Sequence, residues 1–469
     1  MGILQALATI GDYFPSPPRP ARKPDLKRRL IYTFLALVAY YLMASTLAFP
    51  LAAFPQAKGI ALPPIISVIF ASARGTIAQL GIGPLVTAGL LIQILAGAKI
   101  IELDLSKPED RKLFTQAEKG LALIIAAVEG LGFALYYRLN AFITAAIYLQ
   151  FLFGAIVLII LDEAIQKGWG IGSGVSLFIL GGVARRIAWE MFAPVKIANT
   201  DQLYGFFPYL FQALSTGNID TTRLFFGIIP SVSRIMSARY IPTLTGFITT
   251  IVLIFILVYL QQMKVNIPVT TQRAPGIRAK VPLQFLYVTN IPILLVGIVF
   301  SDLLLFNNIA SAYLADKAPW LASALRTMVY YMMTPRTLLE VVYYPTRIVV
   351  YSISLVGLAV LFGFMWVEIA GLNPRAQAEN LIKSGLEIPG VRRNPRLLEA
   401  ILGKYIYPLT FLSSLIVALI ALVANIFGAY GTGMGILLAV GIVQQLYTMI
   451  AYERALEAYP LLKKLMRGE

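Results

Sequence analysis

The chain has 469 residues, of which 58% are hydrophobic and only 13% are charged, and its formal net charge is +16. A soluble domain carries about 25% charged residues, so this composition indicates an integral membrane protein. Its long apolar runs are typical of membrane helices rather than of a β-barrel. Cys and His are absent, which excludes disulfides, thiol nucleophiles, His-based catalysis and nearly all zinc or haem ligation. We therefore predict no catalytic residues, no metal and no cofactor.

The N-terminal segment, residues 1–29, combines an amphipathic pattern with a basic run. Its apolar residues recur at helical spacing: Ile3, Leu4, Leu7 and Ile10. Such a stripe is suited to lying in the membrane interface. The apolar run 30–54 that follows is too long for the core of a signal peptide. We interpret it as a first membrane span that is preceded by a cytosolic N-terminus.

The next stretch, 59–97, is the one around which the rest of the chain is organised. Its apolar piece 64–71 is too short to cross a bilayer, which needs about 20 apolar residues. The stretch then becomes polar, with Ser72 and Gln79 among its residues, and restarts as a helix at Ile82. Two interpretations remain open. It is a broken helix that lines a cavity, with the short piece inside, or an external re-entrant loop followed by an ordinary helix.

Nine further spans bring the predicted total to ten. They are 82–98, 117–137, 141–161, 175–192, 240–260, 285–306, 348–367, 405–427 and 434–451. Lys and Arg are far more frequent in one set of alternate connections, which places both termini in the cytosol. Five spans fall in an N-terminal half (30–192) and five in a C-terminal half (240–451). An odd number in each half makes the halves enter the membrane in opposite senses, as in an inverted repeat.

Three polar residues lie inside predicted spans, where a central charge costs roughly 2.5–3.5 kcal/mol: Thr87, Glu129 and Asn290. Each could simply hydrogen-bond to a neighbouring helix. Alternatively, together they form a polar seam between helices that can separate, or an ion-coupling site.

Two cytosolic connections, 263–282 and 371–404, carry concentrated basic charge in the segments QRAPGIRAK and PGVRRNPR. A solvated face that follows the positive-inside rule would explain the charge. Their Gly and Pro content favours ordered, protruding loops, which would suit an anionic surface such as RNA. The remaining segments are a long external connection, 193–239, and a cytosolic tail, 452–469. A second external connection, 307–347, is also long, and both are half-apolar, so we expect them to lie against the outer leaflet.

Four motifs resemble those of the SecY family, the large subunit of the protein-conducting channel, in its archaeal and eukaryotic branch. They are GIGPLVTAG (81–89), LDEAIQKGWGIGSGVSLFI (161–179), FLYVTNIP (285–292) and ANIFGAYGTGMGILL (424–438). The similarity runs from about residue 20 to the C-terminus. It implies an all-α polytopic membrane protein with ten transmembrane helices. These form two inverted five-helix halves around a central pore, which a short plug helix fills.

The resemblance also implies site residues. The pore ring falls on six aliphatic positions: Ile82, Val86, Val175, Ile179, Leu294 and Leu438. The plug is expected at about 60–74 and includes Ile65, Ile66, Val68, Ile69, Phe70 and Arg74. A lateral gate between the second and third spans and the seventh and eighth contains the polar cluster Thr87, Glu129 and Asn290.

The family's ribosome-contact loops correspond to 263–282 and 371–404. The implied contacts are Arg273, Arg278, Lys280, Arg392 and Arg393. The implied function is to pass unfolded secretory chains across the cell membrane and to release hydrophobic segments sideways into the lipid bilayer. The implied partners are small membrane subunits of the SecE (gamma) and beta types, the ribosome with its RNA, and nascent polypeptides with their signal sequences.

A rival hypothesis from another class is a secondary transporter with an inverted repeat, in which Glu129 is the coupling carboxylate. Such transporters gather several charges within the membrane around one site. Here most carboxylates lie at the ends of spans, for example Asp162, Glu163, Glu340 and Glu368. The carboxylate distribution therefore favours the channel.

Overall fold

Ten long helices occupy the ten predicted membrane spans in the computed structural model. They are α2 (Leu26–Ser45), α4 (Gly83–Gly97), α5 (Pro108–Tyr136), α6 (Ala141–Ala164), α7 (Gly174–Phe192), α10 (Leu244–Gln262), α11 (Ile291–Tyr313), α14 (Pro345–Ile369), α16 (Pro395–Ile426) and α17 (Gly433–Ala458). The structure describes residues 2–53, 67, 70–97, 100–101, 108–137, 139–197, 200–227, 241–271, 274–288, 291–313, 318–335, 337–384, 386–387 and 394–458.

Seven of these helices are long and apolar enough by themselves to cross a membrane: α5, α6, α10, α11, α14, α16 and α17. The other three each have a local reason for failing that criterion. Helix α4 has only 15 residues, and α2 begins with the basic residues of the N-terminal run. Helix α7 carries Arg185 and Arg186, and the structure gives both a partner. Arg185 donates to Ala44 O at 2.9 Å, and Arg186 pairs with Glu190.

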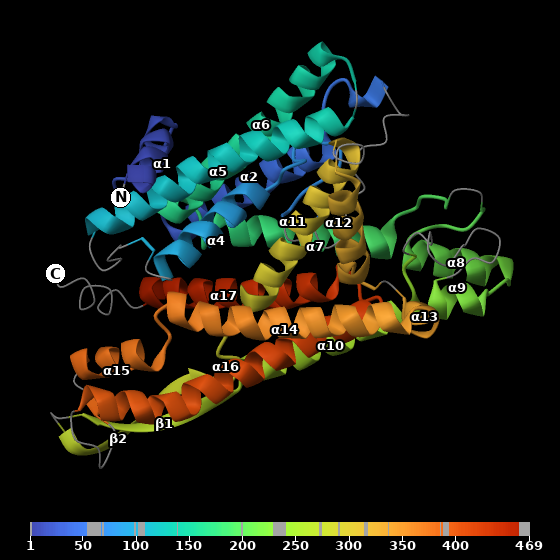
Figure 1. The fold of residues 1–469 in the computed structure, drawn as a ribbon. Coiled ribbons are helices and arrows are strands. Elements are labelled where there is room, and N and C mark those ends of the chain that lie inside the picture. The colour runs from blue at the N-terminus through green and yellow to red at the C-terminus, as the bar shows by residue number, and fades with distance from the viewer. Residues whose placement is uncertain are drawn as a thin grey trace.

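The connections gather at two opposite ends of the helices (Figure 1). One end holds α1 (Gly2–Tyr13), α15 (Pro374–Lys383) and a sheet of β1 (Lys264–Thr271), β2 (Ala274–Gln284) and β3 (Leu386–Glu387) in the order β2-β1-β3. The other end holds α8 (Phe206–Thr216), α9 (Thr221–Phe226) and α13 (Leu338–Tyr343). The remaining elements are α12 (Pro319–Met332), the short helix η1 (Leu51–Ala53) and the π-helical turn η2 (Ile165–Trp169).

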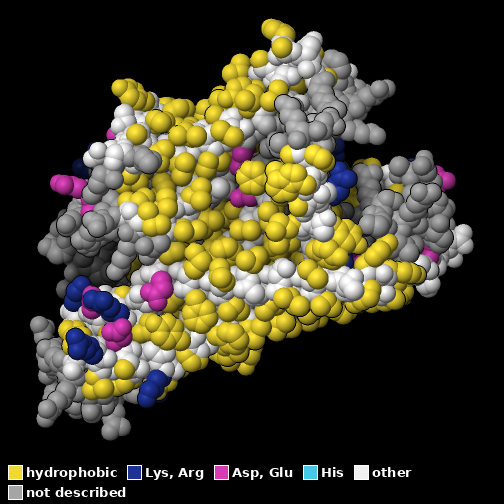
Figure 2. Space-filling model, viewed as in Figure 1, with side chains coloured by type: hydrophobic (Ala, Val, Ile, Leu, Met, Phe, Trp, Pro, Cys, Tyr) yellow, Lys and Arg dark blue, Asp and Glu magenta, His cyan; other side chains and the backbone are white. Residues whose placement is uncertain are grey.

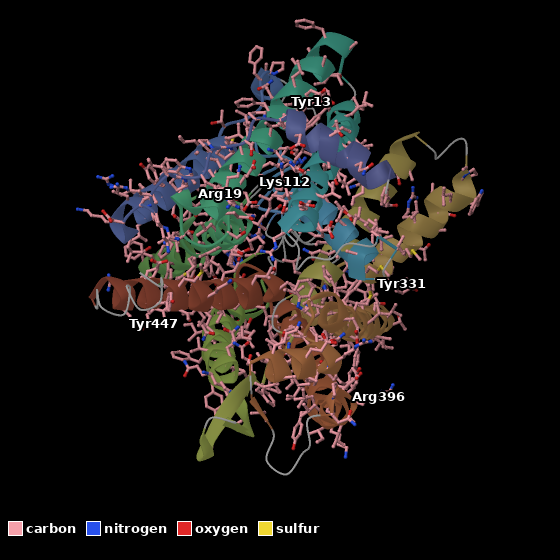
Figure 3. The ribbon with its side chains drawn as sticks, turned by 90° about the vertical axis from the view of Figure 1, so that its left-hand side faces the viewer. Tyr13, Arg19, Lys112, Tyr331, Arg396 and Tyr447 are labelled. Carbon is pink, nitrogen blue, oxygen red and sulfur yellow. The ribbon has the colours of Figure 1, made fainter. Side chains whose placement is uncertain are left out.

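Hydrophobic side chains cover most of the face between these ends, and Lys and Arg gather mainly at the end that holds α15 (Figure 2). This distribution is the one that a bilayer around the middle of the helices requires. Seen from that end, Tyr13, Arg19 and Lys112 lie among the helices of the N-terminal half, and Arg396 lies at the far side of the C-terminal half (Figure 3).

Leu4 and Leu7 of the N-terminal stripe pack on protein rather than facing the membrane interface as expected, whereas Ile10 of the same stripe is 41% exposed. Leu4 and Ala8 are buried against Ile92 and Ala117, and Leu7 packs on the same cluster. Helix α1 approaches α5 so closely that a Cβ at Gly11 would lie 2.2 Å from Gln116 O. Glycine therefore permits a backbone contact that brings Leu4 and Leu7 against α5.

The first span also ends earlier than predicted, at Ser45 rather than near residue 54. Beyond Thr46 the chain becomes extended and pairs with a segment from the next stretch. Ala48 N–H donates to Gly75 O at 2.9 Å, and Ile77 N–H donates to Thr46 O at 3.0 Å. These hydrogen bonds satisfy backbone groups that would otherwise be buried without partners.

The described part of the connection 193–239 is built around Arg223, which is fully buried. Its guanidinium donates to Pro242 O at 2.8 Å and to Leu203 O at 3.1 Å, and it lies over the Tyr209 ring. Burial lowers the pKa of Arg223 to about 10, so the group stays protonated at neutral pH. Helix α8 keeps Phe211 exposed.

Candidate pore and lateral gate

Residues 70–82 form a buried turn rather than a helix. Ile82 N–H donates to Phe70 O at 2.7 Å, and Gly75 N–H donates to the Gln79 side chain. Gly81 has φ +57°, and a Cβ there would lie 1.9 Å from Phe70 O, so only glycine fits. Irregular backbone at membrane depth needs protein or a cavity around it, and this turn is enclosed by protein. For residues 70–82, the enclosed interpretation is therefore preferable to the external loop.

The predicted plug is described only at its C-terminal end. Ile65, Ile66, Val68 and Ile69 lie outside the described residues. Phe70 is buried, and its ring lies 3.1 Å from the place where a Gly83 Cβ would be. Arg74 is exposed. The described end of the predicted plug thus lies directly against the beginning of α4.

All six predicted ring positions lie in one apolar cluster. Ile82, Ile179 and Leu438 are buried members of it, each at most 3% exposed, and Val86, Val175 and Leu294 are partly buried against it. The six residues come from the start of α4 and from α7, α11 and α17, so both halves contribute. Most of them lie within the first two turns of their helices, as a constriction formed by the beginnings of these helices would require.

The predicted gate residues are only partly brought together. Glu129 on α5 lines a cavity of about 20 Å³, together with Ser72 and Gln79 from the turn and Ser301 and Asp302 from α11. This volume is room for about one water molecule. Thr87 does not line that cavity, and its buried hydroxyl has no hydrogen-bond partner in the described part of the chain. Asn290 lies outside the described residues.

Asp302 is a residue at this seam that our sequence-based prediction missed. It lies within the predicted span 285–306, so the rule that selected Glu129, the cost of a carboxylate inside a span, would also have selected Asp302. Acidic side chains do interrupt the otherwise apolar face of the molecule (Figure 2). The two carboxylates come from helices of opposite halves and share one small polar cavity with the turn.

The two halves meet along a second seam as well, where α2 and α7 pack against α17. A charged side chain bridges the two halves at each end of this seam. Near its start, α2 places Arg29 3.0 Å from Glu453 of α17. At the opposite end, Glu190 of α7 accepts a hydrogen bond from Gly431 N–H at 2.9 Å. The seam with the small polar cavity, between α5 and α11, has no such ion pair among the described residues.

The two basic connections 263–282 and 371–404, which we predict to be cytosolic, meet in one sheet. Strand β1 pairs with β2 in an antiparallel hairpin, and β3 from the second connection pairs with β1 through Thr270–Glu387 and Thr271–Leu386. Lys280 is exposed on β2 opposite Pro268, and Arg278 lies opposite Thr270. Arg273, Arg392 and Arg393 lie outside the described residues. The prediction of ordered, protruding loops did not include these strands.

Ten membrane helices in two halves, which share one large apolar cluster and a small cavity lined by carboxylates of both halves, have the architecture of a multi-pass membrane channel. The SecY family model matches residues 76–447. The protein translocase subunit SecY of Aeropyrum pernix is 48% identical over 100% of both chains. A solved structure described as that of a protein conducting channel superposes with a TM-score of 0.77 at 31% identity, over 96% of this chain and 97% of the other. Sec61 in a canine ribosome-channel complex from the endoplasmic reticulum gives 0.75 at 30% identity, with the same coverage.

The chain therefore belongs to the SecY family, and its ten-helix arrangement is that of the SecY fold. The transporter hypothesis finds no support among these relatives.

Proposed function

We propose that this chain is the central subunit of a protein translocation channel. It passes unfolded secretory chains through the membrane and releases hydrophobic segments sideways into lipid. The observation that carries the proposal is the apolar cluster to which six aliphatic side chains from both halves belong or against which they pack. The function of the A. pernix relative, a protein translocase subunit, supports it.

The proposed mechanism needs no catalytic step. Branched aliphatic side chains at a constriction exclude water, and thereby ions, when they touch. They also yield around a passing chain, because they offer it no hydrogen bonds. The free energy for transport comes from the partner that pushes or pulls the polypeptide. The plug in this proposal is about 60–74, and support for it comes from its described end, where Phe70 packs against Gly83 beside the ring residue Ile82.

The seam between α5 and α11 serves as the lateral gate in this proposal. Glu129 and Asp302, with Thr87 and Asn290 as further candidates, make the seam partly polar, so the two halves separate without losing a large apolar contact. A hydrophobic segment inside the channel then partitions into lipid, because each Leu, Ile, Phe or Val at its centre favours the bilayer by about 0.3 to 0.6 kcal/mol.

Cross-linking from position 86 tests the proposed function. A photoreactive residue at Val86 should cross-link to a stalled nascent chain, because Val86 belongs to the proposed ring. The matched control is position 149, on the exposed side of α6, which should not react with the hydrophilic part of the same chain. Equal labelling at both positions, or none at 86, would remove the aqueous path from the proposal.

The proposed surroundings follow from the charge distribution and the relatives. In this proposal both termini, α15 and the hairpin face the cytosol and the channel lies in the plasma membrane, because Lys and Arg concentrate in these segments. Small subunits of the SecE (gamma) and beta types complete the assembly. The ribosome is the proposed cytosolic partner, since the related canine channel is part of a ribosome-channel complex.

Charge reversal in the cytosolic loops should weaken ribosome binding. We expect the triple variant Lys280→Glu, Arg392→Glu, Arg393→Glu to lose about ten-fold or more in affinity, with a shallower salt dependence, because contacts to RNA phosphates release counterions. Sedimentation with ribosomes at two salt concentrations measures both quantities. Lys112→Glu is the control, since Lys112 is exposed on the same side but lies on α5. An equal loss in the control would reduce the loops to a solvated basic face.

A further inference from the structure

Asp162, at the end of α6, is a buried carboxylate that the proposed mechanism does not use. It is 4% exposed. Its Oδ1 accepts hydrogen bonds from Val175 N–H at 2.9 Å and from the Ser173 hydroxyl at 3.4 Å, and its Oδ2 accepts one from the Gln166 amide at 2.7 Å. A buried carboxylate is costly unless such donors satisfy it. Two of the three donors belong to the beginning of α7.

The chain between α6 and α7 is built to bring these groups together. Gly168 has φ +106° and Gly172 has φ +78°, conformations that L side chains rarely adopt. They reverse the chain so that α7 starts beside the end of α6. A Cβ at Gly174 would lie 2.5 Å from Asp162 Cα and 2.8 Å from its Oδ1. Glycine at 174 therefore admits the carboxylate to the first turn of α7.

The N-cap residue of helix α7 does not cap the helix with its own side chain. Ser173 is its N-cap residue, and its side chain accepts no hydrogen bond from the helix. The first backbone N–H groups of a helix need acceptors, and negative charge is favourable at this end. The carboxylate of Asp162, on the neighbouring helix α6, supplies both the hydrogen-bond acceptor and the negative charge. The N–H that it binds is that of Val175, a proposed ring residue, and Ile179, the second ring residue of α7, follows one turn later.

We propose that Asp162 is a positioning residue for the pore constriction. It holds the first turn of α7 in place and thereby sets where Val175 and Ile179 stand in the ring. This inference rests on the proposed function, because it assumes that Ile179 faces the aqueous path.

The absence of native cysteines allows a direct test. In the full chain in proteoliposomes, the variant Ile179→Cys is modified with a membrane-impermeant maleimide from the cytosolic side. Adding Asp162→Ala should raise the modification rate about five-fold, which corresponds to about 1 kcal/mol, the typical value of a lost cap. Asp162→Asn should return the rate to within about two-fold of the parent, because its amide oxygen still accepts from Val175 N–H.

Two controls separate positioning from general loosening. Glu163→Ala removes the adjacent carboxylate, which pairs with Lys119 and Lys167 instead of with α7, and should leave the rate unchanged. Val86→Cys reports the ring from α4, and its modification rate should not respond to Asp162→Ala. Should Asp162→Ala fail to fold, Asp162→Glu moves the carboxylate without removing it and should shift the modification rate at position 179 in the same direction.

The outcomes are distinguishable. No modification of the thiol at position 179 in any background would remove Ile179 from the aqueous path and overturn both the ring and this inference. Modification at position 179 with a rate indifferent to Asp162 would overturn the inference alone. Equal acceleration at positions 86 and 179 would also overturn it, because it would show a general loss of stability.

Discussion

Replacing Ile179 and Leu438 together by serine should raise the resting ion conductance of the reconstituted channel at least about ten-fold. The two side chains are buried in the same cluster but come from opposite halves. Serine removes the branched aliphatic surface that closes the constriction and adds hydroxyls that hold water there. The closed, dry state loses the burial of two large side chains, worth about 1.5–3 kcal/mol each. Conductance in planar bilayers measures the change.

A matched control comes from the same cluster. Val417 is 1% exposed and lies on α16, which contributes no residue to the proposed ring. Val417→Ser should lower the stability of the protein, since it buries a hydroxyl, but should leave the resting conductance near that of the parent. Equal conductance increases in both variants would mean that loosening any part of the cluster opens a leak, and the ring would have no special role.

The second large effect concerns the lateral gate. Replacing Glu129 and Asp302 together by leucine should raise the hydrophobicity that a segment needs in order to leave the channel sideways. The closed seam would then bury apolar side chains where it now encloses a polar cavity of about 20 Å³. If closure gains about 1 kcal/mol, a segment needs roughly two to three more leucines to compensate, at about 0.3–0.6 kcal/mol each.

A reporter series with graded leucine content measures this threshold. Thr410→Val serves as the control, because Thr410 is fully buried on α16 and lies outside the cavity. Its replacement should not move the threshold. A double leucine variant with the parental threshold would show that the seam between α5 and α11 is not the exit path.

Hydropathy located the membrane helices because a bilayer imposes a local rule on sequence. Apolar runs of sufficient length must span, and the ten predicted spans correspond to the ten long helices of the SecY fold. The hydropathy pattern gave wrong element boundaries or types where the backbone pairs with a distant segment. Helix α2 ends at Ser45 because the chain beyond it pairs with Gly75 and Ile77. The hairpin of β1 and β2 was missed because Gly and Pro in a basic segment indicate a loop rather than strands.

The sequence alone was sufficient for the membrane class, the helices and, through four motifs, the family. Only the tertiary structure decided which side chains meet. It joined Glu129 to Asp302 at one seam and Asp162 to the start of α7, and it placed Leu4 and Leu7 of α1 against protein. The physical reason is that hydropathy reports the preference of each segment for lipid. Contacts between distant helices depend instead on crossing geometry, close glycine contacts and the pairing of buried polar groups, and no single segment encodes these.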